Sequence, residues 1–123
     1  MESNRIKIIT YKGKEIIHIN YEGYSKLTEN DFLNMINTAT KFISSRGPGQ
    51  LVISDMRNTH ASTVVVQRFK DASIITKQVR KKGAVIGLNS LQLIFLNAVN
   101  KFSGSNLKAF NTVDDACQWL VEE

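Results

Sequence analysis

The sequence is poor in the residues that usually hold metal ions or covalent cross-links. It has one cysteine, Cys117, and two histidines, His18 and His60, which lie far apart in the chain. One thiol cannot form an intramolecular disulfide or a thiol-rich zinc cluster, and two distant imidazoles do not make a metal-binding motif. We therefore expect no metal, no cofactor and no redox chemistry, with Cys117 serving as a small core residue.

The sequence also lacks membrane, export and catalytic signatures. No apolar run approaches the roughly 18 to 20 residues that a membrane-spanning helix needs. The first residues lack the apolar stretch and the cleavage site of a secretory signal, so we expect a cytoplasmic protein. There is no Gly-x-Ser-x-Gly elbow and no Walker-type glycine loop. These absences predict that the chain is not an enzyme.

Positive charge is what the sequence has in excess. The 123 residues carry a net charge of +5, in an ordinary globular composition that suits a single domain over residues 1–123. The simplest interpretation of the densest basic cluster is a solvated helix face. Nucleic-acid binding through a basic second helix is a weaker alternative. The cluster consists of Arg68, Lys70, Lys77, Arg80, Lys81 and Lys82.

Residues 5–11 and 14–21 predict an opening antiparallel hairpin. Both segments alternate between apolar and polar side chains, and a two-residue turn with a glycine separates them. In the second strand, His18 falls on the face opposite to Ile17 and Ile19. We therefore expect His18 to point away from the main core.

Capping pairs and helical periodicity predict four helices after the hairpin, and short apolar runs predict three more strands. A first helix is predicted over 28–46, followed by a strand over 51–55 that is covered on both faces. The second helix ends in a cap at Gly83, and its inner stripe is Val65, Phe69, Ala72, Ile75 and Val79. A strand over 84–88, a third helix over 90–102 between Asn89 and Gly104, a strand over 107–110 and a fourth helix capped by Thr112 complete the prediction.

The resulting order, ββαβαβαβα, favours an α/β fold with a mixed, mostly parallel sheet covered by about four helices. This order resembles that of the STAS domain, the fold of the anti-sigma-factor antagonists. The resemblance is strongest to a STAS/SEC14-like branch of small, mostly uncharacterised bacterial proteins. It implies a regulatory module that binds a protein partner. The segments that carry it are 51–55, 84–88, 96–104 and 107–110.

The sequence departs from the antagonists after the central strand. Classical antagonists have Asp-Ser-Ser-Gly at the start of the next helix, where a kinase partner phosphorylates the serine. This chain has His60-Ala61-Ser62-Thr63 instead. The departure puts an anti-sigma switch in doubt, but Ser62 and Thr63 remain candidate phosphorylation sites because a helix start tolerates a phosphate.

The segment from Asp55 to Thr63 is the best candidate for a binding site. Ligands of open α/β sheets collect at the carboxyl ends of strands, and helix starts favour anions. A structural alternative is that these polar side chains satisfy turn amides and cap the helix. A catalytic alternative makes His60 a base oriented by Asp55. The residues that we expect to contact a ligand or partner are Asp55, Arg57, Asn58, Thr59 and His60.

The third predicted helix is more apolar than one buried face requires. By helical angle, Leu93 and Leu96 lie opposite to the stripe expected to face the core. Three interpretations of these two leucines are open. They are scattered surface residues, they form a homodimer contact across a two-fold axis, or they belong to a site for an apolar small molecule or lipid. The SEC14 side of the resemblance implies the last of these. The predicted inner stripe is Leu91, Ile94, Phe95, Ala98, Val99 and Phe102.

Overall fold

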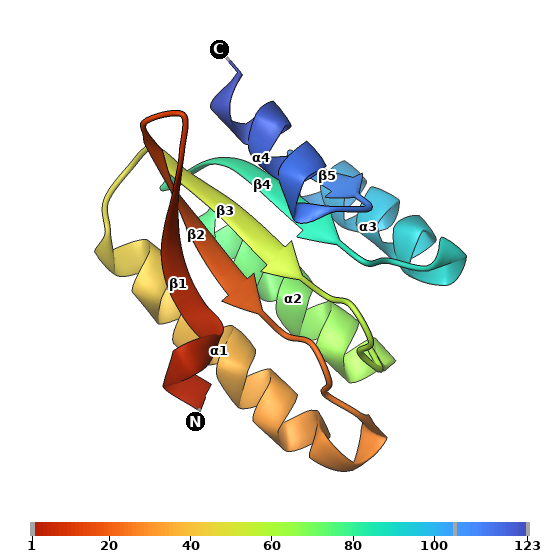
Figure 1. The fold of residues 1–123 in the computed structure, drawn as a ribbon. Coiled ribbons are helices and arrows are strands. Elements are labelled where there is room, and N and C mark those ends of the chain that lie inside the picture. Colours follow the sequence, from red (N-terminus) through yellow and green to blue (C-terminus); the bar gives the residue numbers. More distant parts are fainter. Residues whose placement is uncertain (1, 105, 123) are drawn as a thin grey trace.

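The computed structural model describes residues 2–104 and 106–122, which build one five-stranded sheet with helices on both faces (Figure 1). Short 3-10 turns precede the first strand and the first helix, at Glu2–Arg5 and Lys26–Thr28. The strands and helices are β1 (Ile6–Tyr11), β2 (Lys14–Asn20), α1 (Glu29–Ser45), β3 (Gln50–Asp55), α2 (Thr63–Thr76), β4 (Arg80–Ile86), α3 (Ser90–Ser103), β5 (Leu107–Phe110) and α4 (Val113–Val121).

The strands lie side by side in the order of the sequence. β1 and β2 are antiparallel, and every later pair is parallel. This confirms the predicted mixed sheet with an opening hairpin. Because β2 to β5 run in one direction, their carboxyl ends meet on one side of the molecule and their amino ends on the other (Figure 1). We call these sides the carboxyl end and the amino end of the sheet.

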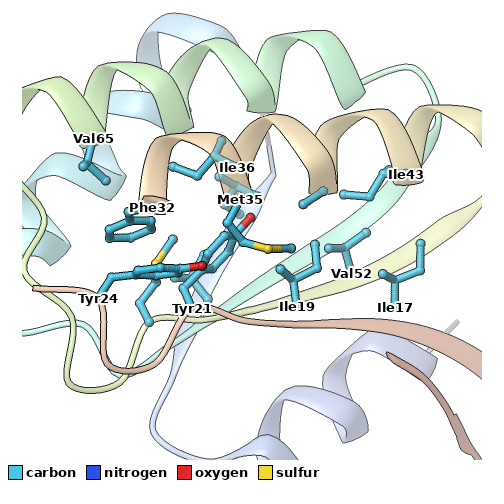
Figure 2. Packing of buried hydrophobic residues seen from close by; sticks show 14 of the residues in the cluster. Ile17, Ile19, Tyr21, Tyr24, Phe32, Met35, Ile36, Ile43, Val52 and Val65 are labelled. Atoms are coloured by element: carbon cyan, nitrogen blue, oxygen red, sulfur yellow. The ribbon is translucent and has the colours of Figure 1, made fainter. Parts of the chain in front are cut away.

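The helices cover the two faces of the sheet unequally. α1, α2 and α3 pack on one face, and α4 packs on the other (Figure 1). Figure 2 shows the larger core, where Phe32 stacks on Tyr24 with the ring centroids 4.9 Å apart. The smaller core packs Cys117 and Leu120 of α4 against β3 and β4. β3 is therefore buried on both faces, as its continuous apolar run predicts.

The capping signals of α3 and α4 were predicted correctly, whereas Thr28, the residue before α1, makes no side-chain capping hydrogen bond. The Asn89 side chain accepts the backbone N–H of Gln92, and the Gln92 side chain accepts that of Asn89. Gly104 closes α3 in a left-handed conformation, and the Thr112 hydroxyl caps α4. No helix in the described part of the chain combines the length and the apolar composition of a membrane span.

The end of α2 differs from the prediction. The helix stops at Thr76, so that Gly83 lies inside β4 rather than at the helix cap, and Ile75 is 63% exposed. The side chain of Arg80, the first residue of β4, lies against this helix end. It turns back to donate hydrogen bonds to the carbonyl of Ser73 and the hydroxyl of Thr76 in the last turn of α2. Helical periodicity carries no sign of this contact.

The basic cluster is therefore not one helix face. Arg80, Lys81 and Lys82 belong to β4. Lys82 donates to the backbone carbonyls of Trp119 and Glu122 at the end of α4, where a cation is favoured. The prediction of a helix that carries all six cations is wrong.

The buried face of α3 also differs from the prediction. Leu96 and Val99 are buried, whereas Leu91 and Ile94 are 61% and 63% exposed. The outward placement of Leu96 is therefore wrong, while Leu93 does reach the surface with 37% exposure. A helix with apolar residues spread around its axis gives little angular signal, and the contacts of α3 with α2 and β5 set its orientation. Two members of the predicted stripe, Phe95 and Phe102, lie outside the described side chains.

Candidate binding site at the carboxyl end of the sheet

The predicted site lies between β3 and α2 at the carboxyl end of the sheet. Asp55 ends β3, residues 56–62 form the connection, and Thr63 begins α2. We call residues 55–63 the β3–α2 segment. The parallel register pairs Asn20 with Asp55 and His18 with Ile53, so β2 brings its last side chains to the same place. Residues far apart in sequence therefore converge here, as is usual at this end of an α/β sheet.

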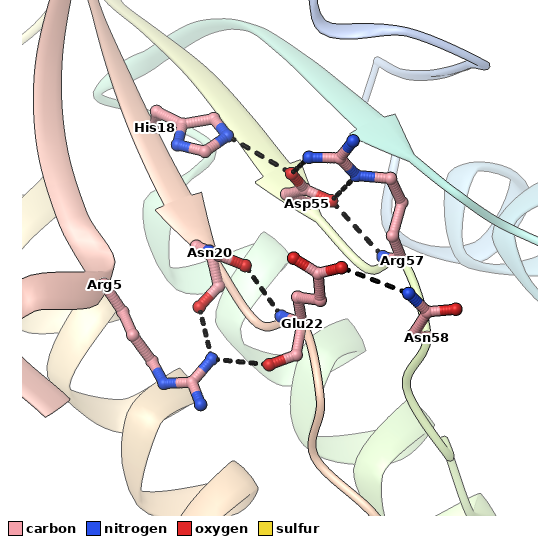
Figure 3. Close-up of polar contacts among 7 residues, drawn as sticks. All are labelled: Arg5, His18, Asn20, Glu22, Asp55, Arg57 and Asn58. Atoms are coloured by element: carbon pink, nitrogen blue, oxygen red, sulfur yellow. Dashed lines mark hydrogen bonds and ion pairs between the residues drawn. The ribbon is translucent and has the colours of Figure 1, made fainter.

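Asp55 is the buried centre of the site, with a side chain that has no exposed surface. Its carboxylate accepts hydrogen bonds from Arg57 Nε at 2.9 Å, Arg57 Nη2 at 2.6 Å and the Arg57 backbone N–H at 3.3 Å (Figure 3). Burial alone would raise the pKa of Asp55, but the contacts with Arg57 outweigh burial and hold that pKa below its usual value. The carboxylate is therefore ionised at neutral pH and fixes Arg57, whose own side chain is 47% exposed.

His18 is a second, partly buried group of the site. Its Nε2 lies 3.4 Å from Asp55 Oδ2, in a contact that lacks hydrogen-bond geometry (Figure 3). Burial lowers the pKa of His18 despite the opposing effect of the carboxylate, so the imidazole is neutral at pH 7. The sequence prediction placed His18 off the main core but did not place it beside Asp55. In the sequence, His18 stands out only as the one histidine among the isoleucines of β2. The strand register is needed to show that it lies beside Asp55.

The connection after β4 holds Arg57 from the other side. Gly87 has φ +85°, and a Cβ at this position would lie 2.5 Å from Arg57 Cγ and 2.8 Å from Arg57 Cα. The Met56 N–H also donates to the Ile86 carbonyl at 2.8 Å. Glycine is therefore needed for this close approach. The sequence analysis did not identify this role of Gly87. The only indication in the sequence is that a glycine follows a buried strand directly.

The residues that follow β2 hold the middle of the β3–α2 segment. The His60 N–H donates to the Tyr24 carbonyl at 2.9 Å, and the Gly23 N–H donates to the Asn58 carbonyl at 3.2 Å. The Asn58 side chain donates to the Glu22 carboxylate at 3.1 Å (Figure 3). These contacts hold the middle of the segment, as those between Asp55 and Arg57 hold its start.

The hydroxyl groups of the segment shape the turn and the helix start. Thr59 Oγ1 donates to the Met56 carbonyl at 2.8 Å. Ser62 Oγ accepts the backbone N–H three residues later at 3.3 Å and donates to Glu29. These contacts agree with the structural alternative, in which Ser62 caps α2. Thr63, the first residue of the helix, is exposed.

The structure does not bring His60 to Asp55. No hydrogen bond or ion pair joins the two within the described residues, and the imidazole beside Asp55 belongs to His18. Arg57, Asn58 and His60 present exposed side chains. No group of three histidine, cysteine, aspartate or glutamate residues in the described part of the chain could hold a metal ion.

An apolar hollow of about 50 Å³ lies beside the segment, between α2, α3 and β4. Met56, Val65, Phe69 and Leu96 are among the residues that line it. Leu96 therefore faces an internal hollow rather than an outer surface. Typical small-molecule pockets begin near about 300 Å³, so this hollow has room for a very small apolar group and not for a lipid chain.

Comparisons with known proteins identify the fold but no family. No protein-family model and no curated protein match the sequence. The structure resembles the crystal structure of an uncharacterized protein of the DUF3478 family with a SpoIIAA-like fold, from Shewanella loihica PV-4. The TM-score is 0.65 at 19% sequence identity, and the match covers 94% of this chain and 91% of that chain. At this identity the likeness shows the fold alone, which is the predicted STAS-like fold of the anti-sigma-factor antagonists.

Proposed function

We propose that this protein is a non-catalytic regulatory module that binds a protein partner through the β3–α2 segment and the adjoining face of α2. The observation that carries the proposal is that the segment is fastened by its own contacts while Arg57, Asn58 and His60 stay exposed. A surface that is ordered before binding loses less conformational entropy when a partner docks. Loops held by a rigid scaffold commonly carry recognition.

The exposed face of α2 extends this surface. Thr63, Val64, Gln67 and Asp71 follow one another along the outer side of the helix and are all exposed. Val64, at 53% exposure, adds an apolar side chain next to the polar groups of the segment. Mixed polar and apolar composition is the usual character of a non-obligate protein interface.

The arrangement around His60 favours a protein that is not an enzyme. His60 has no carboxylate partner within the described residues, and the carboxylate of Asp55 is already saturated by Arg57. Assays for hydrolase and transferase turnover, on wild type and His60→Ala, test this point. We expect no turnover in either protein. A turnover that His60→Ala abolishes while the fold stays intact would defeat the proposal.

Partner binding itself is tested by cross-linked capture from the cells that express the protein, with quantitative mass spectrometry. The test variant is His60→Glu/Val64→Glu, which adds two acids to the proposed surface. The matched control is Asn34→Glu/Thr38→Glu, which adds two acids to exposed positions of α1. A true partner is captured by wild type and control and is depleted at least tenfold with the test variant. Equal capture by both variants rejects this surface.

Phosphorylation is a finer part of the proposal, and Thr63 is the better acceptor. Its side chain is exposed at the first turn of α2, where an added phosphate meets the positive end of the helix dipole. Ser62 caps the helix and donates to the Glu29 carboxylate, which would repel a phosphate. Phosphopeptide mapping of protein from its native cells would show modification at Thr63. Modification confined to Ser62 would overturn this assignment.

A second candidate function is the binding of an apolar small molecule in the hollow between α2 and α3. The apolar lining by Phe69 and Leu96 favours it, and the volume of about 50 Å³ limits the occupant to a few heavy atoms unless α3 moves. Native mass spectrometry of protein purified without detergent tests it. Detection of the bare chain mass alone would remove this candidate.

Three remaining expectations stay proposals with narrower support. A homodimer would use the exposed Leu91, Leu93 and Ile94 of α3, without the buried Leu96. Nucleic-acid binding loses support because half of the basic cluster lies on β4, not on α2. A cytoplasmic location is supported by the single buried thiol of Cys117.

A further inference from the structure

We propose that the amino end of the sheet carries a binding cleft for a small organic anion with an apolar part. The cleft has a volume of about 340 Å³, within the range of roughly 300–1,000 Å³ that is typical of ligand pockets. Its lining residues come from the β1–β2 hairpin, the α1–β3 connection, the start of β4 and the end of α4. Figure 1 shows these segments at the amino end of the sheet. The site is at the opposite end of the sheet from the β3–α2 segment and does not depend on the function proposed for that segment.

Basic side chains from three separate parts of the chain surround this cleft. Lys14 comes from the hairpin, Arg46 from the residue that follows α1, and Lys81 from β4. Glu15 is the one acid among the lining residues described. The lining is therefore net positive, and a ligand with at least one negative charge is favoured there.

Arg46 is held in place at the rim of the cleft. Its Nε donates to the Gln50 side chain at 3.3 Å, and its Nη2 lies 3.2 Å from the Glu15 carboxylate. Gln50 is itself anchored, because its amide donates to the Gly47 carbonyl at 3.1 Å. Two of the five N–H groups of the guanidinium are used in this way, and the fork geometry of the others suits a phosphate or carboxylate. Glu15 is 66% exposed, and such surface pairs are weak enough for a ligand anion to displace.

Two largely buried leucines form the floor of the cleft. Leu51 of β3 and Leu120 of α4 line it and are 6% and 1% exposed. A fully hydrated inorganic ion would leave this floor unused. The combination of cationic rim and leucine floor therefore fits a phosphate monoester or carboxylate that carries a small apolar body.

Titration of ¹⁵N-labelled protein with phenyl phosphate, followed by amide chemical shifts at low salt, tests this inference. We expect saturable shifts of the Gly49, Gln50 and Lys81 amides and none across the β3–α2 segment. Arg46→Gln/Lys81→Gln should weaken binding at least tenfold. Lys26→Gln/Lys41→Gln, which removes two exposed cations elsewhere, should leave binding unchanged. Unfolding midpoints of both variants confirm that they are folded.

Each other outcome contradicts part of the inference. Equal affinity for inorganic phosphate and phenyl phosphate would overturn the role of the leucine floor. Shifts spread over basic residues of the whole surface, or equal weakening by both double variants, would overturn the cleft as a site. Shifts confined to the start of α2 would move anion binding to the carboxyl end.

Discussion

The two ends of the sheet place their charged groups in opposite ways. At the carboxyl end, the carboxylate of Asp55 is fully buried and saturated by Arg57, and Gly87 packs against the Arg57 backbone. At the amino end, Arg46 and Glu15 pair at the rim of a cleft of about 340 Å³, and a Cβ on Gly49 would meet open space. At the carboxyl end the buried charge is paired within the protein, whereas at the amino end charged side chains surround an open cleft.

This difference indicates what each end can do. A closed, internally paired loop keeps one shape and presents its outer side chains, which suits recognition of a protein surface. A hollow with an apolar floor and cations at the rim suits a small ligand. The same fold therefore offers two chemically different surfaces, and substitutions at matched positions separate them.

The largest expected difference compares two glycines with left-handed backbone. Gly87→Ala places a Cβ against Arg57 in addition to the conformational strain, so we expect a loss of about 3 kcal/mol in unfolding free energy. Gly49→Ala meets no neighbour within 4 Å, and we expect only the conformational cost of about 1 kcal/mol. Urea unfolding measures both. Equal losses would mean that the carboxyl end is not the more tightly packed one.

The next effect concerns the buried charge. Asp55→Asn keeps the shape of the side chain but removes the charge that accepts from Arg57, so we expect a loss of about 2 kcal/mol in unfolding free energy. The control Asp71→Asn alters an exposed carboxylate on α2 and should stay within about 0.5 kcal/mol of wild type. If Asp55→Asn matched the control, the ion pair would contribute nothing to the fold.

Much of the fold was predictable because its signals are local. The pair Asn89 and Gln92 marks the start of α3, and Thr112 marks that of α4, since each cap needs only residues three positions apart. The ends set by distant contacts were not predictable. α2 stops where Arg80 folds back onto it, and Leu96 faces a hollow that residues of α2 and β4 also line. Neither of these tertiary contacts can be predicted from hydrophobic periodicity or from helix propensity.

The site was predictable in place but not in detail. The position of Asp55 at the end of a buried strand predicts where polar groups gather. The roles within the cluster depend on register and packing, which bring His18 rather than His60 to the carboxylate. The cleft at the amino end gave no sequence signal, because its cations come from three separate segments.

A smaller effect should appear in the pH dependence of stability. The pKa of His18 is lower in the folded protein than in the unfolded chain, so the unfolded state binds more protons below about pH 6.5. Stability should therefore fall as the pH drops from that value toward the folded-state pKa. Asp55, whose folded-state pKa is also lowered, adds a further fall below about pH 4.

The variant His18→Gln isolates the first of these two falls. It should flatten the stability curve below about pH 6.5 and keep the decline near pH 4. The positive charges of Lys7 and Arg57 also lower the pKa of His18. A decline near pH 6 that persists unchanged in His18→Gln would contradict the assignment of this decline to His18.

Amide hydrogen exchange in the free protein tests most directly whether the β3–α2 segment is fixed before it meets a partner. The amides of Arg57 and His60 donate to Asp55 and to the Tyr24 carbonyl. We predict that both exchange at least tenfold more slowly than amides of an unstructured peptide. Exchange of these two amides at the unstructured rate would contradict a preformed binding surface at the carboxyl end of the sheet.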